Sequence, residues 1–273
     1  MTALFDDLSG LTDRAGSRRD ALRSGAKIGL AAAAAAVPFL TPGRAHAQST
    51  DGDFGILNYA LTLEYLERSF YRQALDTGLI PASTRALFET IRGDEEAHVD
   101  LLSAAITQAG GTPVLYTDSD FTFDDFLGDY ASIRTLAQGL EDTGVRAYKG
   151  QAAAIMNRAG ADSYLTVALQ IHSVEARHAA AVRRLNSNQG WIPDAQPNAP
   201  AAIAPVYGPG MNTDDGMDDS PSEANTVQGG VDLATALSGY TMEEITEAFD
   251  EPLGMPTVLA IAGPFITGEE GDD

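Results

Sequence analysis

The feature that most constrains this sequence is a helical repeat of apolar residues over four consecutive segments. Within each segment apolar side chains recur in steps of three and four, which is the period of a helix with one buried face. Glycine and proline separate the segments, so each helix is expected to end there. The predicted helices span residues 53–76, 83–109, 124–158 and 162–186.

The lengths of the connections indicate how these helices pack. Short turns join the first helix to the second and the third to the fourth, which is typical of antiparallel neighbours in a bundle. The connection from about Gly110 to Phe123 is longer. A helix of about 25 residues is about 38 Å long, and some 13 extended residues reach that far. We therefore expect an all-α four-helix bundle with a long crossover between its second and third helices.

Two Glu-x-x-His pairs interrupt the apolar stripes of the second and fourth predicted helices. Glu95 and His98 form one pair, and Glu175 and His178 form the other. A spacing of three places both side chains of a pair on one helix face, one turn apart. One such pair alone is a weak signal because it arises often by chance. Two pairs at equivalent positions of two helices form a much more specific pattern.

A lone glutamate lies in the middle of the stripe on each of the other two helices. Glu64 precedes Tyr71 by the same spacing as Glu141 precedes Tyr148, so the two halves of the chain repeat. Counted from the helix ends, the four stripe glutamates lie at one depth within about one turn. Buried carboxylates without a partner are costly, so four at one depth need a shared partner. Two divalent cations would supply it, and carboxylate with imidazole suits iron, manganese or zinc.

Several residues leave alternatives open. Glu67 lies one turn beyond Glu64 and is the alternative ligand on the first helix, but its repeat partner is Gly144, so Glu64 is favoured. The two repeated tyrosines are expected to be core residues, with a role beside the metals or in redox chemistry as the alternative. His172 is expected to be structural. The competing interpretation of the Glu and His residues is that they face solvent or pair with arginines such as Arg92.

Residues 1–47 have the organisation of an export signal. A basic segment precedes an apolar run at residues 28–40, and Ala45-His46-Ala47 is a small-residue cleavage pattern. The run is too short for a membrane span of about 20 strongly apolar residues. Arg18-Arg19 resembles the twin-arginine signal, although Ala21 stands where an aromatic residue is commoner. We expect cleavage after Ala47, a periplasmic or extracellular location, and no membrane attachment thereafter.

Charge and composition narrow the partners further. The 273 residues include 17 Lys+Arg and 39 Asp+Glu, a formal net charge of −22, and no cysteine. Without cysteine there are no disulfides, thiolate metal sites or cysteine nucleophiles. Phosphate backbones and anionic lipids repel so acidic a chain, so nucleic acid is not an expected partner.

The segment after the fourth helix differs in composition from the bundle at residues 53–186. Residues 187–273 contain no basic residue and are rich in proline and glycine, which predicts an irregular acidic extension with short helices packed on the bundle. Thr241 and Glu244 have the spacing of a capping box, and Pro252 is expected to stop the helix they open. Residues 257–262 are expected to form a second short helix or a strand.

The pattern of one lone glutamate on each of two helices and Glu-x-x-His on the other two resembles the ferritin-like di-iron carboxylate superfamily. More narrowly, the segments 58–67, 140–144 and 249–253, together with the leader, resemble exported bacterial ferritin-like proteins, a group similar to desiccation-related plant proteins. The resemblance implies that Glu95 and Glu175 bridge two metal ions. The full set of implied ligands is Glu64, Glu95, His98, Glu141, Glu175 and His178.

The resemblance implies a centre of two iron or manganese ions that reacts with O₂ or peroxide, as in a di-iron or di-manganese oxidoreductase. Whether a substrate is turned over stays open, because fold does not settle function. The alternative is a non-catalytic structural or desiccation-tolerance protein on the same scaffold. Storage of iron in a cage is less favoured, since the extension would obstruct shell packing, although a homo-oligomer is compatible with the sequence.

Overall fold

The computed structural model describes residues 52–158, 160, 163–196, 198–213 and 216–267. The expected leader and its cleavage site lie outside these residues. Among the described residues no helix is both long and apolar enough to cross a membrane. The fold is dominated by four long helices, α3 (Asp53–Asp76), α4 (Ala82–Gln108), α5 (Tyr130–Ala152) and α6 (Tyr164–Leu185).

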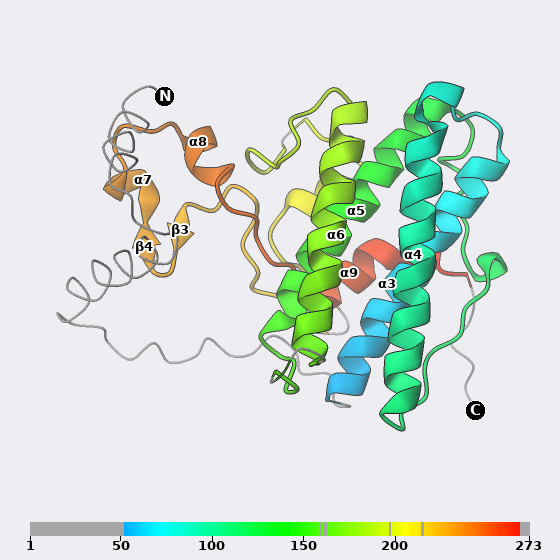
Figure 1. Ribbon diagram of the computed structural model, residues 1–273. Coiled ribbons are helices and arrows are strands. Elements are labelled where there is room, and N and C mark those ends of the chain that lie inside the picture. The colour runs from blue at the N-terminus through cyan, green and yellow to red at the C-terminus, as the bar shows by residue number, and fades with distance from the viewer. Residues whose placement is uncertain (1–51, 159, 161–162, 197, 214–215, 268–273) are drawn as a thin grey trace, which may run out of the picture. The chain divides into compact units, whose positions relative to one another are not determined.

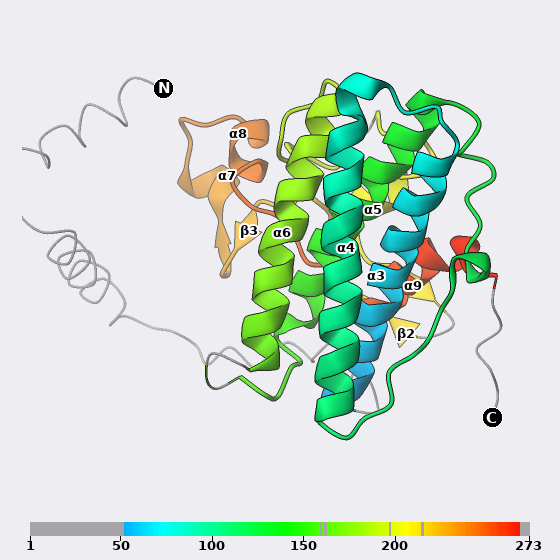
Figure 2. The same cartoon turned by 45° about the vertical axis from the view of Figure 1, so that its right-hand side comes forward.

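The four helices pack as the expected bundle. α3 packs against α4, α5 packs against α6, and the two pairs meet along α3 and α5. Figures 1 and 2 show α4 and α6 on one side of the bundle, with α3 and α5 behind them. A short helix near the end of the chain, α9 (Met255–Ala262), lies against α3 and α5. One side of the bundle is therefore covered by the extension.

The connection from α4 to α5 crosses the bundle along α3 (Figure 2). Near the start of α3, the Asn58 amide donates to the Thr112 carbonyl at 3.0 Å and accepts from the Val114 N–H at 2.9 Å. Near the other end, the Gln73 amide donates to the Phe121 carbonyl at 3.2 Å. The connection includes the short 3₁₀ helix η1 (Asp118–Asp120). The predicted long crossover is confirmed.

The third long helix is shorter at both ends than the predicted 124–158. It begins at Tyr130 because the Asp129 carboxylate caps it, accepting from the Ser132 N–H at 2.9 Å. It ends at Ala152, beyond which the backbone turns toward the start of α3. The backbone N–H groups of residues 156 and 157 donate there to the Asp53 carboxylate, at 2.7 and 2.9 Å. The apolar period reveals neither the Asp129 cap nor the contact with Asp53 that turns the chain after α5.

The extension contains short elements joined by irregular chain. The capping box of Thr241 and Glu244 is present and opens α8 (Met242–Thr246), which ends well before Pro252. The apolar residues 257–262 form part of α9, a helix and not a strand. The other elements are η2 (Ala204–Tyr207), the hairpin of β1 (Asn212–Thr213) with β2 (Gly216–Met217), the hairpin of β3 (Val227–Gln228) with β4 (Val231–Asp232), α7 (Leu233–Ala236) and η3 (Gly263–Phe265).

A buried arginine on α5 holds the extension against the bundle. Arg146 is fully buried and pairs with the buried Glu223 at 2.9 Å. One turn further along α5, Gly150 lets the backbone of Leu253 approach so closely that a β-carbon would clash with the Leu253 carbonyl. The Arg146 guanidinium also donates to the carbonyls of Val206, Gly208, Pro221, Glu251 and Pro252.

Candidate metal centre

The structure brings all six predicted site residues together in the middle of the bundle. The four glutamates are fully buried, and the two histidines are 7% and 6% exposed. The interpretation in which these groups face solvent is therefore wrong. Each long helix contributes one glutamate, and α4 and α6 each add a histidine; the residues are Glu64, Glu95, His98, Glu141, Glu175 and His178.

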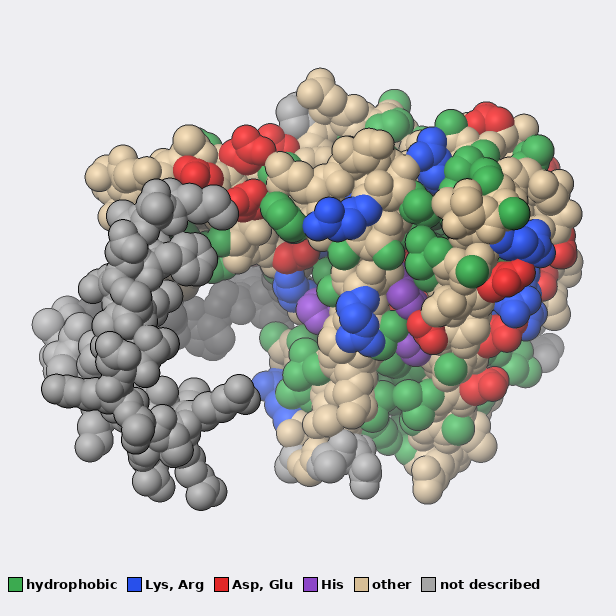
Figure 3. All heavy atoms as spheres, turned by 45° about the horizontal axis from the view of Figure 1, so that its top comes forward, with side chains coloured by type: hydrophobic (Ala, Val, Ile, Leu, Met, Phe, Trp, Pro, Cys, Tyr) green, Lys and Arg blue, Asp and Glu red, His purple; other side chains and the backbone are tan. Residues whose placement is uncertain are grey.

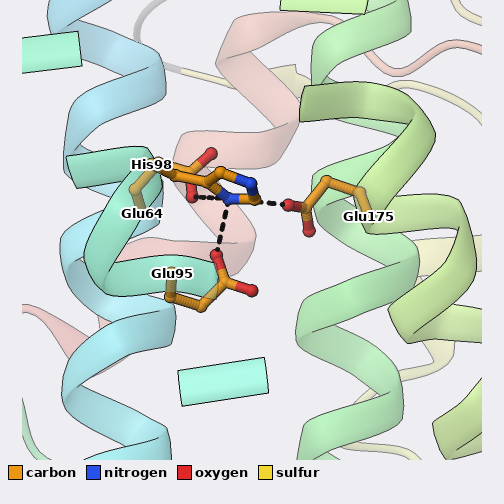
Figure 4. A group of neighbouring side chains, drawn as sticks. All are labelled: Glu64, Glu95, His98 and Glu175. Carbon is orange, nitrogen blue, oxygen red and sulfur yellow. Dashed lines mark hydrogen bonds and ion pairs between the residues drawn. The ribbon is translucent and has the colours of Figure 1, made fainter. Parts of the chain in front are cut away.

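The first group surrounds the Nδ1 atom of His98 (Figure 4). This nitrogen lies 3.0 Å from Glu64 Oε2, 3.1 Å from Glu95 Oε2 and 3.3 Å from Glu175 Oε1. One ligand atom from each of the four residues lies within 4.8 Å of the others. One N–H cannot donate to three carboxylates, so the arrangement has more acceptors than its histidine can serve.

The second group surrounds His178 and shares two glutamates with the first. His178 Nδ1 lies 3.0 Å from Glu95 Oε1 and 3.4 Å from Glu141 Oε2, and Glu175 completes the group. Glu95 therefore directs one carboxylate oxygen toward each histidine. This is the disposition of a carboxylate that bridges two cations.

Several polar atoms at this centre have no hydrogen-bond partner among the described residues. They are Glu95 Oε1, Glu141 Oε2, both carboxylate oxygens of Glu175, and His178 Nδ1. Buried polar atoms are nearly always hydrogen-bonded, so a cluster of exceptions needs a further partner. Two cations held by four carboxylates and two imidazoles would satisfy these atoms, and iron, manganese and zinc accept such ligands. The residues thus fit a pair of metal ions.

Each lone glutamate is held by a tyrosine from the other half of the chain. The Tyr71 hydroxyl on α3 donates to Glu141 Oε1 on α5 at 2.5 Å, and the Tyr148 hydroxyl on α5 donates to Glu64 Oε1 on α3. Burial and the adjacent carboxylate raise the pKa of both tyrosines well above its usual value, so both stay donors. Each tyrosine occupies one carboxylate oxygen and leaves the other facing a histidine.

An aspartate that the sequence reasoning missed orients the second histidine. His178 Nε2 contacts Asp94 Oδ2 at 3.0 Å, and the Asp94 side chain is 47% exposed. Such a contact fixes the ring so that the opposite nitrogen faces the centre. The repeat equivalent of Asp94 is Val174, and no described residue makes the matching contact with His98 Nε2. The sequence signal that could have identified Asp94 is its position directly before the predicted ligand Glu95.

When no cation is present, the two histidines are in their charged form, with a proton on each ring nitrogen. Burial lowers the pKa of His98, but the contacts with Glu175 and Glu64 outweigh burial and raise it far above its usual value. Burial is likewise outweighed at His178, where contacts with Glu141 and Glu95 raise the pKa to about 12. Metal ligands must be deprotonated, so binding of cations releases these protons.

The carboxylates differ according to their partners. Burial raises the pKa of Glu95 to about 7 and holds that of Glu175 well above its usual value. Burial also acts to raise the pKa of Glu64, but the hydrogen bond with His98 outweighs it and the pKa is lowered.

Two residues weighed as alternatives lie outside both groups. Glu67 is 3% exposed, and burial and the nearby Glu175 raise its pKa well above its usual value. The structure thus places Glu64, and not Glu67, among the grouped ligand atoms. His172 is half-buried on α6, where burial and the charge of Lys149 lower its pKa.

Both histidines of the centre lie on the side of the bundle formed by α4 and α6, where they are 7% and 6% exposed. Histidine side chains are visible at the molecular surface in the space-filling view (Figure 3). The opposite side, formed by α3 and α5, is covered by α9.

The fold and the centre together define a four-helix bundle whose buried Glu/His cluster is consistent with a site for two metal ions. Residues 52–188, about half of the chain, match the family described as the ferritin-like domain. The chain belongs to this family. No curated protein matches the chain.

Proposed function

We propose that this chain binds two iron or manganese ions in the bundle core and uses them for redox chemistry with O₂ or peroxide. The observation that carries the proposal is the pair of Glu/His groups that share Glu95 and Glu175. Sharing brings two cations close together, which suits reactions that transfer more than one electron. When bound, the ions supply the electron exchange with O₂ or peroxide.

The chain's own residues would divide the work as follows. Glu64 and His98 would hold one ion, Glu141 and His178 the other, and the two shared glutamates would bridge them. The repeated tyrosines fix one oxygen of each terminal glutamate. Asp94 accepts a hydrogen bond from His178 Nε2, and its partly exposed carboxylate links this ring nitrogen to solvent.

The leader supports a second part of the proposal, namely export. A twin-arginine pathway carries folded proteins, so the chain would acquire its ions before it leaves the cytoplasm. The expected product, cleaved after Ala47, would act in the periplasm or outside the cell. The acidic composition supports solubility there.

Metal analysis tests the proposal. The protein is purified by its own export route without added metal, beside Glu175→Gln, which neutralises a bridging ligand, and Glu96→Gln as a matched control. Glu96 lies next to Glu95 on α4, but its side chain is 37% exposed and pairs with Arg72. We expect two iron or manganese ions per chain in the wild type and control, and fewer than one in Glu175→Gln.

Activity is then measured on the loaded protein. Oxygen consumption on addition of Fe(II), or peroxide breakdown with manganese, would establish the redox function. Two bound ions without either reaction would favour the alternative, a structural protein for stress tolerance that uses metal for stability. A wild type that contains no metal and takes up neither Fe(II) nor Mn(II) would reject the proposal.

A further inference from the structure

A cavity of about 570 Å³ lies where the extension meets the bundle, and none of the six grouped residues lines it. Its wall is formed by α5, the last turn of α6 and the segment that follows α6 (Figure 1). Sites for small molecules usually enclose about 300–1,000 Å³. The cavity therefore has the size of a ligand site, separate from the metal centre.

Amide and hydroxyl groups dominate the lining of this cavity. Of the 14 residues that line it, six carry a side-chain amide and two carry a side-chain hydroxyl. Amides and hydroxyls both donate and accept hydrogen bonds. The wall thus suits a ligand that carries many groups of the same dual character.

A buried glutamine orients two of the asparagines in the wall. Gln138 is 4% exposed, and its carbonyl oxygen accepts from the Asn186 and Asn188 amides at 3.1 and 2.8 Å. Its own amide donates to the Tyr207 hydroxyl at 2.8 Å, so Gln138 is held in turn. Neither asparagine Oδ1 accepts a hydrogen bond from another described residue, which leaves both oxygens as acceptors for a ligand.

The buried cation of the cavity already has its counter-charge. Arg183 lines the cavity, is 1% exposed and pairs with the buried Asp142 at 2.7 Å. Asp194 is the one other charged group among the described lining residues, and its Oδ1 accepts from the Gln196 N–H at 2.7 Å. A charge removed from water without a full counter-charge is costly. An anion would meet Asp194 and a cation would meet the guanidinium, so the wall favours a neutral ligand.

Ser187 occupies a position that glycine normally takes. Its φ of 63° is left-handed. The N–H groups of residues 187 and 188 donate to carbonyls in the last turn of α6, at 3.1 and 2.9 Å, and glycine is the usual residue in such a cap. A serine there strains the backbone but places a hydroxyl on the cavity wall. Among the described residues the only other non-glycine with a positive φ is Gln196, which lines the same cavity, and such strain concentrates at ligand sites.

We propose that this cavity binds a neutral carbohydrate, whose hydroxyls bond to the amides and hydroxyls of the wall. Each sugar hydroxyl both donates and accepts, as the lining groups do. Pro193, Pro200 and Ile203 supply apolar surface against which the C–H groups of a sugar ring can pack. The site does not depend on the metal centre, so this function is additional to the proposed redox chemistry.

Isothermal titration calorimetry with sugars tests the proposal on the protein purified by its own export route. The neutral set is glucose, galactose, maltose and lactose. Glucuronate, galacturonate, glucosamine and galactosamine carry a charge on the same rings. We expect at least one neutral sugar to bind once per chain with a Kd of about 1 mM or lower. The charged forms of its ring should bind more weakly by about tenfold or more.

Two variants locate the bound sugar. Ser187→Gly removes the hydroxyl, while glycine suits the left-handed backbone. Affinity for the sugar should fall about 3–10-fold, as for the loss of one hydrogen bond, while the midpoint of urea unfolding stays the same or rises. Asn198→Ala should lower the affinity similarly, because its exposed amide lines the cavity. Asn212→Ala should match the wild type, since Asn212 is an exposed asparagine of β1 outside the cavity.

Three outcomes would overturn the proposal. If none of the neutral sugars binds, the cavity is not a carbohydrate site. Tighter binding of a charged form than of its neutral sugar would contradict the argument from the charges of the wall. Unchanged affinity in both folded cavity variants, or an equal loss in Asn212→Ala, would place the sugar outside this cavity.

Discussion

Tyr148→Phe should weaken binding of one metal ion and leave the other nearly unchanged. The Tyr148 hydroxyl donates to Glu64 Oε1, and both groups are buried. Phenylalanine keeps the ring but removes the donor, so Glu64 loses the contact that keeps its other oxygen facing His98. Removal of a partner that orients a metal ligand typically costs about 10–100-fold in affinity. A buried acceptor left without its donor costs about 1–3 kcal/mol, which corresponds to a similar range.

Calorimetric titration with Mn(II) measures this effect. The wild type should bind two ions, and in Tyr148→Phe one of the two steps should weaken by about 10–100-fold. Tyr71→Phe should do the same through Glu141. Tyr130→Phe is the matched control, because its hydroxyl donates at 2.7 Å to Thr84, away from the centre. The reasoning is refuted if Tyr148→Phe binds both ions within twofold of the wild type, or if Tyr130→Phe weakens them equally.

Four further predictions concern protons, ligand orientation and the extension. Because the pKa values of His98 and His178 are raised, binding of two ions should release at least two protons into weak buffer and tighten as pH rises; release of none would contradict this. Without metal, the protonated histidines should contribute their full share to the free energy of unfolding below about pH 6.5. That contribution should fall as the pH rises toward the pKa of about 12 of His178, and unfolding titrations at several pH values measure it. Asp94→Asn should weaken one binding step about 10–100-fold in the same calorimetry, and equal loss at both steps would be unexpected. Arg146→Met should lower the free energy of unfolding in urea by about 3–5 kcal/mol, because it leaves Glu223 buried without its guanidinium partner. A loss below about 1 kcal/mol would show that other contacts hold the extension.

The centre could be predicted from the sequence because its residues obey the helical period. Glu64 and Glu95 lie at similar distances from the turn between α3 and α4, so counting residues placed them at one depth. The same argument applied to Glu141 and Glu175. In a regular helix the sequence spacing of two residues fixes their relative position along and around the helix axis. α3 has the bounds that the pattern predicted.

The remaining features depend on contacts that no period encodes. The start of α5 is set by the Asp129 cap, and the chain beyond its end is held by Asp53 at the start of α3. Asp94 is an ordinary exposed residue until α6 brings His178 beside it. The extension is held largely by backbone carbonyls around Arg146, and carbonyls carry no sequence signal.

A crystal structure of the protein loaded with Mn(II), with anomalous scattering recorded for manganese, tests the central claim most directly. The account predicts two anomalous peaks about 3.5–4 Å apart, one in the His98 group and one in the His178 group, with Glu95 and Glu175 bridging them. One peak, or peaks confined to acidic residues at the surface, would contradict a dinuclear centre in the bundle core.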